Sequence, residues 1–473
     1  MGATSCEEAL EKYPRASMAD EEAMADIEGI EATLAGLYNR LQTGSYNHAE
    51  MNLAGGLLAD QLKVADANSG RFIAYPTNRE ATSSFSFDRN NWAGIYNDIN
   101  RINMMLYYID DVEATEDRVN RVKGQAKAMR GYLYFDLMKI FARPPMYQSP
   151  LVEGEPLGVI IKTDPFLGID EDTFAPRSTI DECYELIQDD FESSLAYLPD
   201  DNPDFPYYFT DISVRALLAR LHLFLGNWQE AVNYAEEVIA YPDASLVEAE
   251  NYLDAFADAP GAESIFELGY TSADRPGMNT SVQGLAYQEG AVGYGDIILR
   301  HDLQELLDEF RGHGDVRPEM TKDYNKEGQD VVYQTKFRGY RGERYWDDIR
   351  IIRTAEMFLI AAEAHAELGQ FDQARDYLVE LRDHRVIEDV DDIQVEDNLD
   401  DFIDFIMTER RVEFFSEMSH RWFDLRRRGM DIPKGCPDND PGHPVSFDDY
   451  RVVGRIPNAE IEANENCIQN PGY

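Results

Sequence analysis

The chain has 473 residues, of which 90 are Asp or Glu and 43 are Lys or Arg, so its formal net charge is −47. Nucleic acids and anionic lipid surfaces bind proteins through basic side chains, and this charge therefore excludes both as partners. The carboxylates are spread along the whole chain. We expect the folded protein to need salt to screen their repulsion, as halophilic proteins do.

The N-terminal residues carry a candidate anchoring site. Cys6 follows the small residues Ala3, Thr4 and Ser5 and precedes an acidic segment. The charged and apolar regions of a secretory signal are missing, and we infer that an upstream signal has been trimmed, with residues 1–2 as a cloning remnant. A free surface thiol at Cys6 is the alternative. No run of about 18 apolar residues occurs, so we expect no membrane-spanning helix.

Two stretches combine aromatic rings with amides, the side chains that stack on sugars and bind their hydroxyls. They cover about residues 44–103 and 255–348, and we interpret both as segments of a ligand-binding face. The ligand contacts that we predict in them are Asn91, Trp92, Tyr287, Tyr294, Tyr345 and Trp346. The four-residue spacing of Trp92 and Tyr96 also fits a core pair on one helix face, which is the alternative for Trp92.

Apolar periodicity predicts four helix pairs. They cover about residues 122–198, 211–240, 349–385 and 399–429. In the second and third pair a helix ends at Gly226 or Gly369, an aromatic residue follows two positions later and an alanine five positions later. This pattern is typical of tetratricopeptide repeats. His222 and His365 occupy equivalent repeat positions, so we expect them to pack between helices.

The repeat predicts a mostly α fold. Helix pairs should stack as a right-handed superhelix on one side, with a loop-rich ligand face carrying short strands on the other.

Catalytic motifs are absent: the chain has no H-E-x-x-H, Walker loop, G-x-S-x-G, C-x-x-C or dinucleotide glycine loop. We therefore predict no catalytic residue, no metal site and no cofactor. Two alternatives stay open, because a glycosidase carboxylate pair is defined in space and because Asp438, Asn439 and Asp440 could hold calcium. Cys436 and Cys467 flank a Pro-, Asp- and Gly-rich stretch and could form a disulfide.

Three charged or polar motifs lie in the C-terminal third. Residues 353–364 read RTAEMFLIAAEA, residues 409–429 contain ERRVEFFSE and RWFDLRRRG, and residues 455–473 begin RIPNAEI and end QNPGY. The helical spacing of the charges predicts ion pairs between neighbouring helices. An anion clamp built from residues 426–428 is the alternative. The turn residues of the tail predict a chain end that is pinned to the body.

These motifs resemble those of the SusD/RagB family, and the resemblance runs nearly end to end. Residues 92–103 resemble a family helix whose start borders the ligand face, and residues 3–11 resemble the junction where precursors are cleaved. Such proteins are outer-membrane lipoproteins of Bacteroidota-type bacteria. The resemblance implies lipidation at Cys6, a tether over residues 1–20, a single SusD-like domain over residues 21–473 and anchoring at the cell surface.

The same resemblance implies a binding protein and not an enzyme. It would capture a glycan or another nutrient and pass it to a SusC-like TonB-dependent transporter. A tetratricopeptide-type scaffold for protein segments is the first alternative, and a glycoside hydrolase is the second.

Overall fold

The computed structural model describes residues 23–43, 46, 49–75, 86–147, 157–169, 173–199, 203–258, 260–261, 263–387, 393, 395–433 and 444–473. Helices make up 52% of the structure, against about a third in an average globular protein. The predicted mostly α class is therefore confirmed. Cys6, the predicted tether, Cys436 and residues 438–440 lie outside the described residues.

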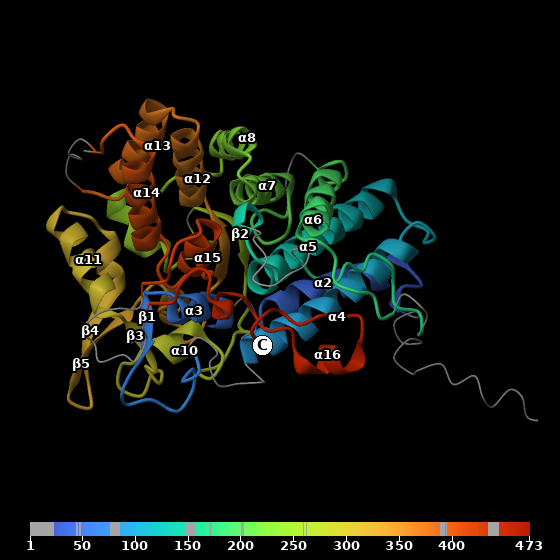
Figure 1. Ribbon diagram of the computed structural model, residues 1–473, viewed down its shortest axis with the longest axis horizontal. Coiled ribbons are helices and arrows are strands. Elements are labelled where there is room, and N and C mark those ends of the chain that lie inside the picture. The colour runs from blue at the N-terminus through green and yellow to red at the C-terminus, as the bar shows by residue number, and fades with distance from the viewer. Residues whose placement is uncertain are drawn as a thin grey trace, which may run out of the picture.

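Each predicted helix pair is present as two helices that pack against one another. The pairs are α5 (Glu116–Phe141) with α6 (Ile180–Leu195), α7 (Asp211–Leu225) with α8 (Trp228–Ile239), α12 (Thr354–Glu367) with α13 (Phe371–Asp383), and α14 (Leu399–Glu413) with α15 (His420–Arg427). Successive pairs also meet, through α6 with α7, α8 with α12, and α12 with α14. Figure 1 shows this succession along the upper edge of the molecule. Its right-handed sense stays a prediction.

The repeat pattern produces the same local structure twice. Gly226 and Gly369 have φ angles of 74° and 72°, in the left-handed region that glycine adopts without a steric penalty. Each glycine ends the first helix and allows the tight turn into the second. Ala231 and Ala374 are fully buried, and their small side chains let the second helix approach the first closely.

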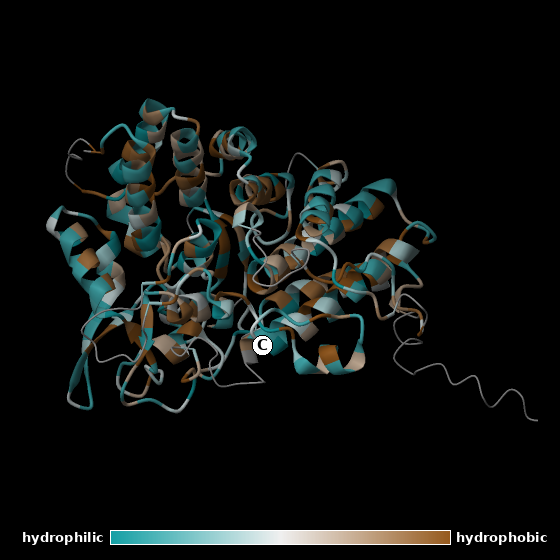
Figure 2. Cartoon of the chain, viewed as in Figure 1, coloured by the Kyte–Doolittle hydropathy of each residue, from teal (hydrophilic) through white to brown (hydrophobic). Residues whose placement is uncertain are grey.

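The repeat histidines pack against tyrosines of the second helix. His222 stacks on Tyr234 and His365 stacks on Tyr377, both with ring centroids 5.6 Å apart. The packing role predicted for these histidines is therefore confirmed. The outer helices are amphipathic, as the mixture of teal and brown on α8 and α13 in Figure 2 shows. Apolar side chains on one side of each helix pack into the core.

Within the described residues, the strands form three two-stranded antiparallel sheets. They are β1 (Leu62–Val64) with β3 (Ile297–Leu299), β2 (Ser264–Leu268) with β6 (Ile349–Arg353), and β4 (Thr321–Lys326) with β5 (Gln329–Gln334). In the second sheet Leu268 pairs with Ile349. The segment that leaves β2 therefore starts beside the segment that enters β6, and these two segments form part of the candidate site.

The described residues form seven further α-helices. They are α2 (Ile27–Leu41), α3 (Ala49–Leu58), α4 (Ser86–Tyr108), α9 (Tyr252–Ala255), α10 (Val282–Ala286), α11 (His301–Gly312) and α16 (Asn458–Ala463). Cys183 and Cys467 are buried free thiols. In the described part of the chain, no helix is both long and apolar enough to cross a membrane.

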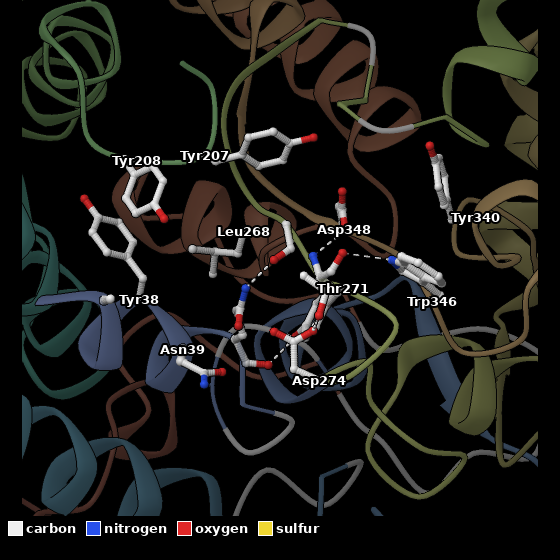
Figure 3. Close-up of a pocket in the computed structure, with 14 residues that line it drawn as sticks. Tyr38, Asn39, Tyr207, Tyr208, Leu268, Thr271, Asp274, Tyr340, Trp346 and Asp348 are labelled. Carbon is white, nitrogen blue, oxygen red and sulfur yellow. Dashed lines mark hydrogen bonds between the residues drawn. The ribbon is translucent and has the colours of Figure 1, made fainter. Parts of the chain in front are cut away.

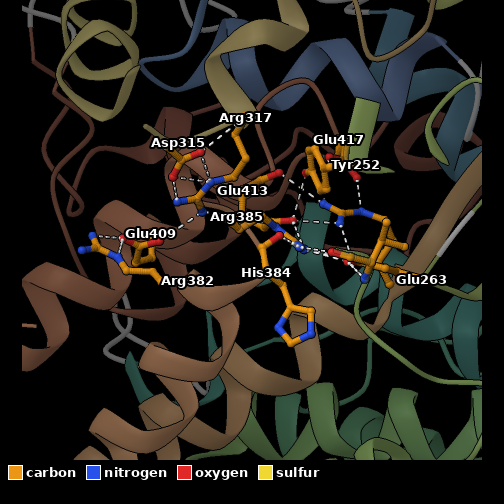
Figure 4. Close-up of polar contacts among 12 residues, drawn as sticks. Tyr252, Glu263, Asp315, Arg317, Arg382, His384, Arg385, Glu409, Glu413 and Glu417 are labelled. Atoms are coloured by element: carbon orange, nitrogen blue, oxygen red, sulfur yellow. Dashed lines mark hydrogen bonds and ion pairs between the residues drawn. The ribbon is translucent and has the colours of Figure 1, made fainter. Parts of the chain in front are cut away.

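The charged motif of residues 409–417 lies inside the protein, as Figure 4 shows. Glu413 is fully buried and accepts hydrogen bonds from Arg317, Arg353 and Arg385 at 3.2, 2.8 and 3.0 Å. We call the surrounding cluster the Glu413 network. Its members are Lys336, Arg317, Arg353, Arg382 and Arg385 with Glu263, Asp315, Glu409, Glu413 and Glu417. The formal charges of these five cations and five carboxylates cancel.

Electrostatics in the Glu413 network favour the ionised form. Burial raises the pKa of Glu413, but Arg385, Arg353 and Arg317 outweigh it and hold this pKa well below its ordinary value. Outside the network, Arg427 donates to Glu363 at 2.6 Å and to Asp424 at 2.8 Å. The prediction of ion pairs between helices is confirmed, and the Arg427 guanidinium is occupied by scaffold carboxylates instead of an anionic ligand.

The C-terminal segment is pinned to the body, as predicted. The Asn470 side-chain amide donates to the carbonyls of Phe141 and Gly454 at 2.8 and 2.7 Å. The Tyr473 hydroxyl donates to the Val453 carbonyl at 2.9 Å.

Candidate ligand-binding site

A cleft lined by aromatic side chains opens between helix α2, the loop before α7 and the ends of β2 and β6. Its volume is about 540 Å³, and we call it the aromatic cleft. The described residues that line it are Ala35, Tyr38, Asn39, Gln42, Tyr207, Tyr208, Leu268, Gly269, Tyr270, Thr271, Asp274, Tyr340, Trp346 and Asp348. In Figure 3, Tyr38, Tyr207 and Tyr208 lie across the cleft from Tyr340 and Trp346.

Hydrogen bonds between the segment after β2 and the segment before β6 hold one side of the aromatic cleft. The Tyr270 amide donates to Asp348 Oδ1 at 2.8 Å, and the Trp346 indole N–H donates to the Tyr270 carbonyl at 3.1 Å. The Tyr340 ring lies 5.5 Å from the Trp346 ring. Because the indole nitrogen is already bonded, the orientation of Trp346 is set before any ligand arrives.

The opposite side is fixed by Tyr38 of α2. Its hydroxyl donates to Gln125 Oε1 at 3.0 Å and accepts the Phe209 amide at 2.9 Å, so it belongs to the scaffold. Its ring meets Tyr208 edge-on at 4.7 Å. At the base of the cleft, a Cβ on Gly269 would lie only 2.6 Å from the Tyr207 ring. A larger residue at this position, just after β2, would therefore have to displace this ring.

Three buried carboxylates, which we call the acidic wall, lie on β2 and just before β6: Glu267, Asp347 and Asp348, of which Asp348 lines the cleft. Burial raises the pKa of Glu267 and of Asp347 to about 7, and it also raises the pKa of Asp348. The positive charge of Arg350 acts on all three and opposes these shifts. One guanidinium is thus shared among three carboxylates.

The chemistry of the aromatic cleft suits a sugar. Flat rings can pack against pyranose faces, and the amides of Asn39 and Gln42 and the carboxylates of Asp274 and Asp348 can bind hydroxyls. Among the described residues, no group of three or more His, Cys, Asp or Glu side chains is arranged to hold a metal ion.

Other hollows are present in the described part of the chain. One, of about 540 Å³, is lined by Arg275, Glu343 and Tyr345 and borders the aromatic cleft, since residues 274–275 and 345–346 are consecutive. Another, of about 510 Å³, runs along α4. The polar groups of its Tyr96 and Asn103 already bond to backbone atoms of residues 160–164, so fewer of them remain for a ligand.

The structure contradicts the predicted exposure of Trp92 and Asn91, which are only 3% and 1% exposed. Helix α4 packs against α5, and Trp92 points into that contact, with its ring 5.0 Å from Phe141. Its indole N–H donates to Glu460 at 3.3 Å. The Asn91 amide donates to the Phe87 carbonyl one turn earlier. Both residues belong to the core, which was the alternative interpretation of the Trp92 spacing.

The four other predicted contacts separate into two places. Trp346 lines the aromatic cleft, and Tyr345 lines the hollow beside it. Tyr287 is 8% exposed and its hydroxyl donates to Glu289 at 2.7 Å. Tyr294 lies under the Arg71 guanidinium, 4.4 Å from its ring centroid. Tyr287 and Tyr294 do not line the cleft.

Sequence reasoning missed most of the opposite side of the cleft. Tyr38, Asn39 and Gln42 come from α2, and Tyr207 and Tyr208 come from the loop before α7. A signal for the loop was available, because residues 205–209 read FPYYF in a segment that a proline keeps out of a helix. The criterion that selected residues 255–348, aromatic side chains outside the repeats, applies equally to this run.

Comparison with known proteins relates this chain to a family. The family model described as "Starch-binding associating with outer membrane" matches residues 10–223, and that of the "SusD family" matches residues 318–473. SusD-like protein P38 from Formosa agariphila is 24% identical to this chain in an alignment that covers 92% of this chain and 90% of the relative.

Solved structures agree over almost the whole chain. A SusD superfamily protein from Bacteroides thetaiotaomicron superimposes with a TM-score of 0.83 at 26% identity, covering 94% of this chain and all of that one. A laminarin binding SusD-like protein has a TM-score of 0.71 at 20% identity, covering 94% and 99% of the two chains, and shares the fold. From its C-terminal motifs, its helix-pair architecture and these matches, the chain belongs to the SusD/RagB family.

Proposed function

We propose that this protein captures an oligosaccharide in the aromatic cleft, without cleaving it, and passes it to a SusC-like TonB-dependent transporter for import. The observation that carries the proposal is the cleft itself, in which rings from both sides face a space rimmed by amides and carboxylates. Family membership supports glycan binding, as does the fold shared with a laminarin binding protein.

Trp346 is the main stacking platform in this proposal. Its indole is fixed by the bond to the Tyr270 carbonyl, and a ring that is already ordered loses little conformational entropy on binding. Tyr340 extends the aromatic surface at 5.5 Å, and Tyr345 continues it into the neighbouring hollow. Asn39 is exposed at the rim, where its amide can bind sugar hydroxyls.

The transporter partnership and the lipid anchor at Cys6 are inferred from the family resemblance. Both are accessible to one experiment, in which the full-length precursor is expressed with its native signal and outer membranes are isolated. We expect the protein in the membrane fraction and a TonB-dependent barrel among the proteins that co-purify with it. Replacing Cys6 with Ser should release it from the membrane.

Glycan binding is tested by a matched pair of tryptophan variants, after a glycan array has identified a ligand. Trp346→Ala should weaken binding at least tenfold, equivalent to about 1.4 kcal/mol, because it removes the stacking platform. Its melting temperature should stay close to that of the wild type. Trp92→Ala should instead lower the free energy of unfolding by about 3–5 kcal/mol, because it opens a cavity between α4 and α5.

Isothermal titration and thermal melts of both variants decide the site. If Trp346→Ala binds the array ligand as tightly as the wild type, the aromatic cleft is not the binding site. If products of hydrolysis appear when the protein is incubated with that ligand, the non-enzymatic part of the proposal is wrong.

A further inference from the structure

The ionisable side chains that line the aromatic cleft are acidic or phenolic. Asp348 lies at its floor and Asp274 at its mouth, and none of the described lining residues is Lys, Arg or His. Asp274 Oδ1 accepts the backbone N–H and the hydroxyl of Thr271, at 2.6 and 2.7 Å, which holds this carboxylate in place on an exposed turn. A ligand in the cleft therefore meets two carboxylates in fixed positions.

Above about pH 7, where Glu267 and Asp347 lose their protons, the acidic wall adds negative charge behind Asp348. Glu267 and Asp347 are 0% and 6% exposed, so water screens them poorly. Arg350 is the cation that acts on all three carboxylates of the wall, and its Nη2 donates to the Phe256 carbonyl at 3.1 Å. The carboxylates of the wall outnumber this cation three to one.

Arg275 and Arg344 line the neighbouring hollow, and the one that contacts a ring of the cleft, Arg275, is already paired. Arg275 lies over the Trp346 ring at 6.0 Å, but its guanidinium donates to Glu343 at 2.9 Å. It lines the neighbouring hollow and not the aromatic cleft. The Trp346 ring thus has a cation on one side, which is the partner that the electron-rich face of an indole favours.

We infer that the aromatic cleft selects glycans by charge: it prefers amine-bearing sugars to neutral ones and rejects sugars that carry carboxylate or sulfate groups. This inference rests on the proposed glycan-binding function. Carboxylates and ring faces both attract an ammonium group, and carboxylates also accept hydrogen bonds from neutral hydroxyls. An anionic sugar in the cleft would lie beside Asp274 and Asp348, with no cation among the described residues that line the cleft, and like charges in contact are strongly unfavourable.

Charge selection by the cleft differs from the general repulsion of anionic sugars by the net charge of −47. Repulsion between exposed charges is screened within about 3 Å at 1 M salt, whereas interactions among buried groups are screened much less. Discrimination by the cleft should therefore persist in about 1 M NaCl, and discrimination by the overall charge should disappear there.

The test starts with an array of neutral, amine-bearing, carboxylated and sulfated oligosaccharides. The neutral oligosaccharide that binds best is then prepared in three forms: native, oxidised to carboxylates at its primary hydroxyls, and aminated at the same positions. Titration calorimetry in about 1 M NaCl should rank the amine form first and the carboxylated form last, at least tenfold below the native form.

Asp274→Asn links the ranking to the cleft. Asparagine keeps the side-chain oxygen that accepts from Thr271 and removes the charge. Because Asp274 is exposed, this variant is compared in about 0.1 M NaCl, where the ratio of native to carboxylated affinity should narrow about threefold. Asp376→Asn, on the exposed face of α13, removes one charge far along the chain and is the matched control. For Asp376→Asn, the ratio of native to carboxylated affinity should equal that of the wild type.

The outcomes separate the two proposals. If anionic sugars bind as well as neutral ones, or if Asp274→Asn leaves the ratio unchanged, charge selection by the cleft is overturned while glycan binding stands. If no sugar of any charge binds, the proposed function itself is wrong, and the inference falls with it.

Discussion

The Glu413 network and the acidic wall are two buried charged regions with opposite balance. In the network, Glu413 lies between three arginines, and cations and carboxylates are equal in number. In the wall, three carboxylates share Arg350. The pKa of Glu413 is accordingly held well below its ordinary value, whereas the pKa of Asp347 is raised to about 7 by burial.

The difference teaches what buried charge is used for in each region. A balanced network costs much less than isolated buried charges, and it joins segments that are far apart in the sequence. Arg353 ends β6 and precedes α12, Glu413 ends α14 and Glu263 precedes β2, so the network connects the helix stack to the sheets of the ligand face. An unbalanced wall destabilises the fold, and it lies where a ligand is expected to bind.

The largest effect should come from unbalancing the network. Glu413→Gln keeps the shape of the side chain but leaves Arg317, Arg353 and Arg385 without a central carboxylate. We expect a loss of about 3–5 kcal/mol in the free energy of unfolding, measured by urea denaturation, or failure to fold. The control is Glu237→Gln, which breaks a half-exposed pair with Arg215 and should change stability little. A Glu413→Gln midpoint equal to that of the wild type would contradict the structural role of the network.

Relieving the acidic wall should stabilise the protein, and only at high pH. Asp347 has a pKa of about 7 when folded and 3.8 as its ordinary value, so the folded state binds more protons between these values. Its contribution to the free energy of unfolding therefore falls as pH rises from about 4 to 7 and stays low above that.

Asp347→Asn removes this cost. One pKa unit corresponds to about 1.4 kcal/mol, and the new amide N–H₂ replaces an oxygen with no hydrogen-bond partner among the described residues, which offsets part of the gain. We expect the variant to exceed the wild type by about 2 kcal/mol at pH 8 and not at pH 4. An equal difference at both pH values would mean that the Asp347 charge is not the cause.

The smallest expected effect concerns charges outside both regions. Most of the 90 acidic residues lie outside both regions, and the chain has only 43 basic residues. The repulsion between these acidic side chains extends about 30 Å in 10 mM salt. The melting temperature should rise by several degrees between about 10 mM and 2 M NaCl, with sulfate avoided because it stabilises proteins generally. Asp347→Asn should show the same salt dependence as the wild type. A flat profile would argue against halophilic adaptation.

The sequence predicted the helical scaffold well because its signals are local. The spacing of glycine, aromatic residue and alanine that starts at Gly226 and Gly369 involves only six consecutive residues. The structure has the same tight turn at both glycines. The ion pairs of the Glu413 network were also expected, but its members were not all foreseen. Arg317 and Glu263 come from residues 255–348, which we had interpreted only as ligand face.

The candidate site was predicted only in part because it is assembled from distant segments. Composition identified Trp346, but it could not show that Trp92 points into the core. Tyr38 and Phe209 are 171 residues apart, and they meet through a hydrogen bond and a ring contact. Such a pairing depends on how α2 packs against the rest of the fold, and no local pattern encodes it.

The anchoring of Asn470 bears on how the protein is made. Its amide bonds to the carbonyl of Phe141, the last residue of α5, across a separation of 329 residues. During synthesis or export, the hydrogen bond between Phe141 and Asn470 therefore cannot form until the whole intervening chain is present. Contacts of such long range slow folding, so nascent forms that end before residue 470 should stay open at this helix end and depend on chaperones for longer.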